Sequence, residues 1–363
     1  MARHDSLVHT FEPFGSHQHP LPNHLKPMST LPRKIIFDTD PGVDDAMALY
    51  YALAHPDLDV VGITTTFGNV YVEQAATNAL YLSALAGRQI PVTVGMSQPL
   101  VKKPETPPDY IHGADGLGNL PQRLATQGEL DPRSSAQFIV DMARQFPGEI
   151  TLVAVGPLGN LATALQLAPE LPKLVREVVL MGGAVLESGN VSPVAEANIW
   201  NDPHAADAVF TAGWPLTMVG LDVTHQVILP LSLFRQIAEH HQHLATDTLC
   251  HAVAFYSAFY SAHDAVVGQI NGCYGHDVLA FVVLTDPELF TLQSGRVRVA
   301  VDGLAQGQTI MQRKAVSYPQ HGWHDDIPHT QVCMRVQAEA CKAVIEATLM
   351  RDWMEKPLLA LIL

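Results

Sequence analysis

The fold is indicated most strongly by the stretch Lys34-Ile-Ile-Phe-Asp-Thr-Asp-Pro-Gly-Val-Asp-Asp45. Its first part, Lys34 to Asp38, is a short apolar run that ends in a turn, as is typical of a buried parallel strand. Pro41-Gly42 then turns the chain, and apolar residues recur at helical spacing from Asp44 to Ala54. The stretch therefore predicts a strand, a tight turn and a helix in direct succession.

The same alternation of strand and helix continues along the chain. Apolar runs bounded by turn residues predict further strands at residues 60–66, 90–94, 150–155, 177–181 and 216–219. Helical spacing lies between them, at residues 71–86, 134–145, 158–167 and 203–211. Regular alternation of this kind predicts an α/β fold with a mostly parallel central sheet flanked by helices on both faces.

The two ends of the chain depart from this alternation. Residues 1–33 carry five histidines and no periodic apolar pattern, which favours a flexible His/Pro-rich leader over the alternative of a metal-binding tail. After Leu229 the pattern is mainly helical, and candidate strands return from Arg296 to Val301. We therefore expect a single α/β domain over residues 34–363, with a helical elaboration in its C-terminal half.

Composition and charge exclude several classes of protein. Of the 363 residues, 47% are hydrophobic and only 16% are charged, a mixture that can bury a large core. Acidic residues outnumber basic residues by 36 to 21, so the formal net charge is −15. Such a surface repels nucleic-acid backbones and anionic lipid, which argues against a nucleic-acid or membrane partner.

Signals of export or membrane insertion are not visible in the sequence. No apolar run reaches the roughly 20 residues of a spanning helix, and the N-terminus lacks a basic start followed by an apolar stretch. The four cysteines form no C-x-x-C pair, as expected for free thiols of a reducing compartment. These features predict a cytoplasmic protein.

Four carboxylates lie within eight residues at the carboxyl end of the first predicted strand: Asp38, Asp40, Asp44 and Asp45. Ligands of open parallel sheets bind at this edge. Asp38 and Asp40 point the same way because strand side chains alternate, and Asp44-Asp45 open a helix whose positive end favours carboxylates. No lysine or arginine lies within the motif, so a cation is the economical way to neutralise it. Oxygen ligands alone suit a hard ion, Ca²⁺ or Mg²⁺.

Three other interpretations compete for these acids. A helix cap with surface carboxylates explains Asp44 and partly Asp45, but not two acids on one face of a buried strand. An EF-hand loop that began at Asp38 would need a glutamate at its twelfth position, where Leu49 stands. A Mg²⁺-dependent phosphatase or phosphotransferase that uses Asp38-Thr-Asp40 remains the alternative function, although it would need a lysine and a later acidic pair.

Several motifs give the chain a resemblance to a known family. Asp38-Thr-Asp-Pro-Gly-Val-Asp-Asp45 resembles the signature of the inosine–uridine-preferring nucleoside hydrolases. Further blocks follow in the family's order from about residue 33 to 335: Thr64-Thr-Thr-Phe-Gly-Asn69, Ile111-His-Gly113, Val178-Val-Leu-Met-Gly-Gly183, Glu196-Ala-Asn198, Asp222-Val-Thr-His225, His276-Asp277 and His329-Thr-Gln-Val332. The resemblance implies a Rossmann-like nucleoside hydrolase fold that forms a homodimer or homotetramer. It also implies Ca²⁺-dependent hydrolysis of the N-glycosidic bond of ribonucleosides, which gives ribose and free nucleobase for purine or pyrimidine salvage.

The resemblance also assigns a metal site and a general base. It implies that Ca²⁺ is held by Asp40, Asp45, Asp277 and the backbone carbonyl of Val155. The family often has threonine at the position of Val155, a change that a backbone ligand tolerates. Asp40 would also accept the proton of the attacking water, while Asp38 would orient its neighbours. Because no implied metal ligand is missing, a nucleoside-binding protein without catalysis is disfavoured.

The resemblance further implies a set of substrate-binding residues: Asp44, Asn69, Glu196 and Asn198 for the ribose hydroxyls, and Met181 for the pocket wall. His112 is assigned to the base-side pocket, with His225 as support. His276, next to Asp277, is the candidate acid that protonates the departing base, although one histidine among 18 is often structural. Val278 stands where the family often has proline, which affects the local turn.

Contacts to the nucleobase are assigned to an aromatic face of a predicted helix. Tyr256 and Tyr260, followed by His263, lie one turn apart and could stack on a base. An aromatic stripe in the core explains the same spacing equally well. The loop from Lys102 to Gly118, which we call the flap, is rich in proline and glycine and is expected to cover the site.

Overall fold

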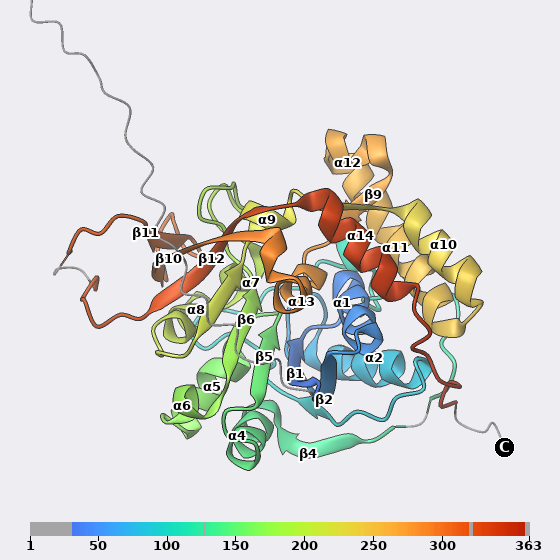
Figure 1. The fold of residues 1–363 in the computed structure, drawn as a ribbon, viewed down its shortest axis with the longest axis horizontal. Coiled ribbons are helices and arrows are strands. Elements are labelled where there is room, and N and C mark those ends of the chain that lie inside the picture. The colour runs from blue at the N-terminus through green and yellow to red at the C-terminus, as the bar shows by residue number, and fades with distance from the viewer. Residues whose placement is uncertain (1–30, 127, 319–321, 360–363) are drawn as a thin grey trace, which may run out of the picture. The chain divides into compact units, whose positions relative to one another are not determined.

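The computed structural model describes residues 31–126, 128–318 and 322–359, so the predicted leader at residues 1–33 lies almost wholly outside the described residues. From Pro32 onward the chain forms one compact unit. Its centre is a ten-stranded sheet with the order β11-β10-β12-β7-β6-β5-β1-β2-β3-β4 (Figure 1). These strands are β1 (Arg33–Thr39), β2 (Leu58–Thr65), β3 (Val92–Val94), β4 (Leu130–Ser134), β5 (Ile150–Ala154), β6 (Glu177–Met181), β7 (Leu216–Val219), β10 (Phe290–Val299), β11 (Thr309–Gln312) and β12 (His329–Val336).

The prediction of a mostly parallel sheet is confirmed. All neighbouring strands from β4 across to β12 run parallel, and only β10 pairs antiparallel, with β12 on one side and β11 on the other. Parallel strands point their carboxyl ends to one edge of the sheet. The loops that follow β1, β2, β5, β6 and β7 therefore meet at this edge, which is where ligands of such sheets bind.

Helices cover both faces of the sheet because each central strand buries both of its faces. In β1, Ile35 and Phe37 enter one apolar core and Ile36 enters the other, as the alternation of strand side chains requires. The first core contains α1 (Val43–Ala54), α2 (Val72–Leu85), α13 (Val278–Thr285) and α14 (Ala338–Leu349). The second contains α4 (Ser135–Gln145), α5 (Gly159–Leu167), α6 (Leu171–Leu174) and α8 (Pro203–Phe210).

A helical elaboration follows β7, as the sequence predicts. A two-stranded antiparallel sheet, β8 (Ile228–Pro230) and β9 (Gly272–Tyr274), encloses the helices α10 (Leu231–His241), α11 (Leu244–His263) and α12 (Ala265–Ile270) in the sequence. Short helices lie in other connections: α3 (Asp109–His112), α7 (Ala197–Asn201), α9 (Leu221–Thr224) and the 3₁₀ turn Pro287–Leu289. Each of α3, α7 and α9 carries or adjoins a residue of the predicted site.

Three strands toward the two ends of the sheet are not anticipated by the apolar pattern: β4, β11 and β12. β4 has no fully buried residue, contains Pro132 and pairs with β3 alone among the described strands, so it lacks the continuous apolar run of a central strand. β11 has four residues and lies at the opposite edge. The central strands agree within two residues with their predicted bounds because burial on both faces gives them a clear apolar signal.

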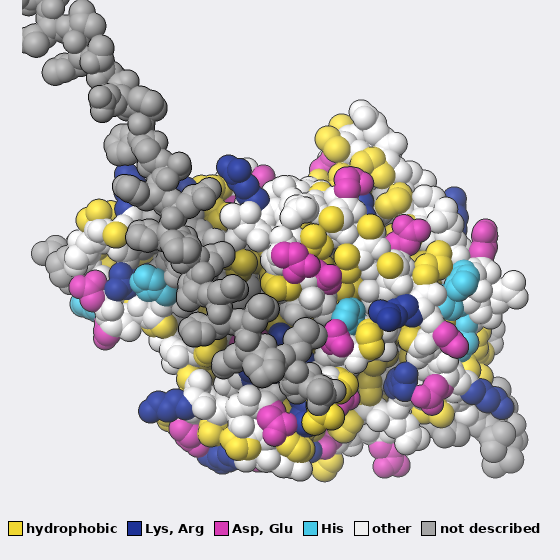
Figure 2. Space-filling model, viewed as in Figure 1, with side chains coloured by type: hydrophobic (Ala, Val, Ile, Leu, Met, Phe, Trp, Pro, Cys, Tyr) yellow, Lys and Arg dark blue, Asp and Glu magenta, His cyan; other side chains and the backbone are white. Residues whose placement is uncertain are grey.

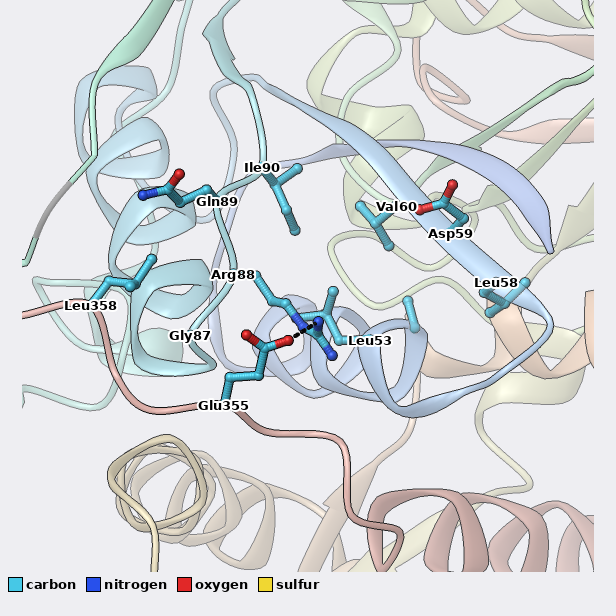
Figure 3. A pocket seen from close by; sticks show the side chains of 11 residues that line it. Leu53, Leu58, Asp59, Val60, Gly87, Arg88, Gln89, Ile90, Glu355 and Leu358 are labelled. Atoms are coloured by element: carbon cyan, nitrogen blue, oxygen red, sulfur yellow. Dashed lines mark hydrogen bonds and ion pairs between the residues drawn. The ribbon is translucent and has the colours of Figure 1, made fainter.

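The opposite end of the strands carries a separate cleft, which Figure 3 shows. Residues 350–359 run back past α2, where Arg88 forms an ion pair of 2.6 Å with Glu355 and donates a 2.9 Å hydrogen bond to the carbonyl of Trp353. The resulting cleft of about 560 Å³ is bordered by Leu58 and Asp59 at the start of β2. Within the described ranges, no helix is long and apolar enough to cross a membrane.

Candidate active site

The acidic motif is placed at the carboxyl edge by the first strand–turn–helix unit. β1 ends at Thr39, so Asp40 lies just beyond the strand, and α1 begins at Val43. The Asp45 carboxylate accepts the backbone N–H of Gly42 at 2.9 Å and so caps the helix. Asp277 precedes α13 directly. Two helix N-termini thus direct their positive ends toward the same acids.

Three of these acids come together in one group. Carboxylate oxygens of Asp44, Asp45 and Asp277 all lie within 4.8 Å of one another, and the three side chains are buried. Asp40 is linked to this group by Asn69, whose backbone N–H donates to Asp40 at 2.7 Å while its side-chain amide donates to Asp45 at 3.0 Å. We call Asp40, Asp44, Asp45 and Asp277 the acid cluster.

Asp38 lies beside the acid cluster but has partners of its own. Its carboxylate accepts hydrogen bonds from the Thr64 hydroxyl at 2.5 Å and the Asn160 amide at 2.8 Å. Asn160 also donates to the carbonyl of Thr65 at 2.9 Å, which ties α5 to the end of β2. Asp38 is therefore bonded to residues that follow β2 and lie in α5, and its role as a residue that orients its neighbours stays a prediction.

Burial gives the acids of this edge unusual proton affinities. Desolvation raises the pKa of Asp38 to about 7 and the pKa values of Asp44 and Asp45 to about 6. It also raises the pKa values of Asp40 and Asp277 well above the ordinary range, and the neighbouring carboxylates raise them further. A positive charge among the acids would favour their ionised forms and so lower these pKa values.

The acid cluster fits a hard cation. One oxygen each of Asp40 (Oδ1), Asp44 (Oδ1) and Asp277 (Oδ2) is buried and accepts no hydrogen bond from any described residue. Buried carboxylate oxygens without donors are costly unless an ion completes them. An all-oxygen set with several carboxylates is the donor chemistry that Ca²⁺ or Mg²⁺ prefers. These residues therefore could hold such an ion.

Two glycines let the backbone approach Asp40 closely. A Cβ atom added at Gly156 would lie 2.6 Å from Oδ1 of Asp40, and one added at Gly68 would overlap Oδ2. Gly156 follows β5 and Gly68 follows β2, so both belong to loops of the carboxyl edge. Any side chain at either position would displace Asp40.

The predicted backbone ligand and the predicted sugar ligands are in mutual contact. The amide of Asn198 donates to the carbonyl of Val155 at 2.7 Å and to the carbonyl of Met181 at 3.1 Å. Glu196 caps α7, since its carboxylate accepts the backbone N–H groups of Asn198 at 2.8 Å and Ile199 at 3.1 Å, and it also accepts that of Gly183 at 2.9 Å. Burial raises the pKa of Glu196. The ends of β5 and β6 thus present a connected set of polar groups beside the acids.

Histidine and tyrosine residues form the other wall. The Val43 backbone N–H donates to Nδ1 of His112 at 3.2 Å, and this nitrogen lies 3.8 Å from Oδ1 of Asp44. Burial lowers the pKa of His112 to about 4, so the ring is neutral near pH 7. The His112 ring lies 5.1 Å from that of Tyr256, whose hydroxyl donates to Asp44 at 3.1 Å.

A row of hydrogen bonds connects this wall to His276. The hydroxyls of Tyr256 and Tyr260 are 3.3 Å apart, and the Tyr260 hydroxyl lies 3.1 Å from Nε2 of His276. Nδ1 of His276 is 2.8 Å from the Thr224 hydroxyl. Burial lowers the pKa of His276 well below its usual value. His263 stands outside the row, because its exposed ring bonds to the carbonyl of Phe259 in its own helix.

Some residues of the site are missing from the sequence-based prediction. Thr224 and Asn160 touch predicted site residues, and Asn78 donates to the carbonyl of Pro41 at 2.8 Å. Thr224 lies inside the quoted block Asp222-Val-Thr-His225, so a signal for it exists. Asn78 and Asn160 are single amides in helices, and nothing local distinguishes them from surface residues.

Comparisons with known proteins point in one direction. The chain matches the profile described as inosine-uridine preferring nucleoside hydrolase over residues 35–343, a range that includes the whole acid cluster. It is 42% identical to the probable uridine nucleosidase 2 of Arabidopsis thaliana over 323 residues, which are 88% of this chain and 98% of the relative. A solved plant nucleoside hydrolase has a TM-score of 0.83 and 37% identity, with 88% of this chain and 100% of that chain covered. A purine-preferring ribonucleoside hydrolase from Gardnerella vaginalis has a TM-score of 0.78 and 34% identity, with 88% and 98% covered.

Proposed function

The chain belongs to the inosine-uridine preferring nucleoside hydrolase family and is an enzyme of that type, and from this premise we propose that it hydrolyses ribonucleosides with the help of Ca²⁺. The products would be ribose and the free nucleobase. The observation that carries the proposal is the acid cluster. In it, Asp44, Asp45 and Asp277 converge, and one buried oxygen each of Asp40, Asp44 and Asp277 has no donor among the described residues. Family membership also removes support from the alternative of a phosphatase or phosphotransferase.

The proposed metal ligands are Asp40, Asp45, Asp277 and the carbonyl of Val155. Asp44 lies in the same group, and its hydrogen bond from Tyr256 leaves Oδ1 open toward the cluster. When bound, a divalent cation supplies positive charge that keeps the carboxylates ionised and lowers the pKa of a neighbouring water.

The proposed general base is Asp40. Its Oδ1 atom is buried and unbonded, while Asn69 and the close backbone of Gly68 and Gly156 fix the carboxylate. In the reaction, the bond from C1′ to the base nitrogen breaks and a bond from C1′ to the water oxygen forms. Asp40 takes the proton of that water, which a neutral amide could not do.

The proposed ribose ligands come from three segments of the carboxyl edge. Asp44 lies in the first turn of α1, Asn69 follows β2, and Glu196 and Asn198 lie at the start of α7. Hydroxyls need paired donors and acceptors, which carboxylates and amides supply. The Met181 thioether lies 3.6 Å from the Asn198 amide and would border the sugar.

The proposed acid for the leaving group is His276. Its Nε2 atom contacts the Tyr260 hydroxyl, so a proton can pass to the departing base directly or through Tyr260. Because burial lowers the pKa of His276 and leaves the ring neutral near pH 7, His276 would first have to take up a proton from water, and the negative charge that develops on the base would favour that uptake. His112, Tyr256 and Tyr260 would surround the base on this side.

The decisive experiment is incubation with inosine, uridine, cytidine and a 5′-nucleotide, followed by chromatography of free base and phosphate. We expect free base from neutral nucleosides and no phosphate from the nucleotide. Prolonged chelation should abolish turnover, and Ca²⁺ should restore it. Release of phosphate without release of base would contradict the proposal.

Two further proposals concern assembly and location. A homodimer or homotetramer and a cytoplasmic location follow from the family resemblance and from the free cysteines. Light scattering of the purified full chain would determine the assembly. A monomeric mass at working concentration would contradict this part alone.

A further inference from the structure

The flap has two unlike halves. Residues 103–106, 109 and 110 are exposed, whereas residues 112, 113 and 116–118 are buried. The buried half is fixed by Asp115, whose carboxylate accepts the backbone N–H groups of Leu117 at 2.9 Å and Asn119 at 2.8 Å. Asn78 joins it to the acidic motif by donating to the carbonyls of Asp115 and Pro41. In the exposed half, residues 109 and 110 belong to α3 and the Tyr110 ring lies 5.8 Å from that of Phe259, whereas residues 103–106 belong to no helix or strand.

The exposed half is instead held at its beginning by three side chains. The ammonium of Lys102 forms an ion pair of 2.6 Å with Glu105 and lies 3.9 Å from the centre of the Trp200 ring. It also donates to the carbonyl of Trp200 at 3.2 Å, and the Trp200 indole N–H donates to Glu105 at 3.2 Å. The Lys102 side chain is only 11% exposed, so this cluster exceeds an ordinary surface ion pair.

Trp200 connects this cluster to the proposed ribose ligands. It lies in α7, two residues after Asn198, and its backbone N–H donates to the carbonyl of Glu196 at 2.8 Å. The far end of the exposed half reaches His112, which accepts the N–H of Val43 at the start of α1. The exposed half therefore spans from the sugar side of the site to the base side, with an anchor at each end.

We propose that Lys102, Glu105 and Trp200 are positioning residues that hold the flap in its substrate-binding arrangement by fixing it to the helix that carries Asn198. This rests on the proposed function, because it concerns how a nucleoside is retained. Without the anchor, the exposed half must be ordered each time substrate binds, and that cost weakens binding. The chemical step would be unaffected, since none of the three residues touches the acid cluster.

The test uses Lys102→Met in the full-length protein, because methionine keeps much of the length of the side chain and removes its charge. The matched control is Lys342→Met, which breaks the 2.7 Å ion pair with Glu339, also three residues apart, on α14. We expect Lys102→Met to raise by about tenfold the KM for a nucleoside that the wild type hydrolyses. Its kcat should stay within about twofold of the wild-type value. Chymotrypsin should also cleave faster after Tyr110, which is 66% exposed. The control should match wild type in both measurements.

Trp200→Phe provides a second variant, since it keeps a ring and loses both hydrogen bonds to Glu105. It should move KM and cleavage in the same direction as Lys102→Met. Unchanged KM in both variants, or a lower kcat at unchanged KM, would overturn the inference. If wild type hydrolyses no nucleoside, the proposed function fails. The chymotrypsin measurement needs no nucleoside. Equal cleavage rates in wild type and in both variants would therefore overturn the inference that these residues hold the flap, whatever the outcome for the proposed function.

Discussion

The acids of the acid cluster and the acids at the surface differ in burial and in the charges that surround them. In the cluster, Asp40, Asp44, Asp45 and Asp277 are buried side by side, and carboxylates rather than cations dominate their surroundings. At the surface, acidic and basic side chains are interspersed, as Figure 2 shows for one face. Asp131, for example, lies 2.7 Å from Arg133.

The difference appears in the pKa values. Hydrogen bonds from Arg133 lower the pKa of Asp131 to about 2, whereas burial raises those of Asp44 and Asp45 to about 6. A surface acid such as Asp131 pairs with a neighbouring basic side chain, so its charge is balanced without a bound ion. The acids of the cluster have hydrogen bonds only on some oxygens, and no described residue donates to the others. The comparison teaches that the cluster, unlike the surface acids, could hold a cation, because the basic side chains of the described residues do not neutralise it.

The largest effect should come from Asp40→Asn, which replaces the carboxylate of the proposed base in the acid cluster by a neutral amide. We expect kcat for nucleosides to fall by about 10³-fold, because an amide cannot accept the proton of the attacking water. Steady-state kinetics would measure this loss, and calorimetry should still detect bound Ca²⁺, because the converging group of Asp44, Asp45 and Asp277 stays intact. Asp131→Asn is the control and should retain full activity. Turnover near the wild-type rate in Asp40→Asn would remove it as the base.

His276→Ala should have a large effect that depends on the leaving group. Hydrolysis of inosine or uridine should slow by about 10²-fold or more, because the departing base loses its proton donor. A riboside with an activated phenolate leaving group needs no proton and should be hydrolysed nearly as fast as by wild type. Asp40→Asn should slow both substrates. Equal losses on both substrates in His276→Ala would shift the acid role to Tyr260 or His112.

In the metal-free protein, the buried acids should make the free energy of unfolding depend on pH. The folded-state pKa of Asp44, about 6, exceeds its ordinary value, so folding binds a proton near pH 5 and this stabilisation is lost as pH rises toward 7. Asp44→Asn lacks that loss. Between pH 4 and 7, the free energy of unfolding of Asp44→Asn should therefore rise relative to that of wild type by about 2 kcal/mol.

Urea unfolding of both proteins in a chelator, at several pH values, measures this difference. Using the difference cancels the opposite trend of His112 and His276, whose lowered pKa values favour folding as pH rises. Saturating Ca²⁺ should change the pattern by stabilising wild type at pH 7. A difference that does not vary with pH would contradict the account of the buried acids.

The smallest effect should come from Asp131→Asn at the surface. Asp131 stabilises the folded state at neutral pH, and its contribution is lost only as pH falls from about 4 toward 2. The pair with Arg133 is partly exposed, so the variant should lose less than about 1 kcal/mol. Thermal unfolding at pH 7 checks this value. A loss of free energy of unfolding as large as that for a buried ion pair would contradict the contrast drawn here between surface and buried acids.

Much of the fold and part of the site could be predicted from the sequence. β1, the turn at Pro41 and α1 follow from one contiguous stretch, so the positions of Asp40, Asp44 and Asp45 at the carboxyl edge follow too. β6 and β7 also lie where their apolar runs predict. In these places, local pattern and burial on both faces agree.

The rest depends on tertiary contacts that leave no local pattern. Asp277 is more than 200 residues from the motif, and only the family resemblance brings it to the cluster. Tyr256 could be predicted to lie near the site, but not that its hydroxyl donates to Asp44. Thr224 and Trp200 act through neighbours from other segments, and their sequence surroundings are ordinary.

The central claim is that the buried acids form a cation site, and calorimetric titration of chelator-stripped protein with Ca²⁺ tests it most directly. It needs no substrate and no assumption about the reaction. We predict one Ca²⁺ bound per chain in wild type and in Asp131→Asn, and no binding in Asp45→Asn or Asp277→Asn. Absence of binding in wild type, or unchanged binding in Asp277→Asn, would contradict the account.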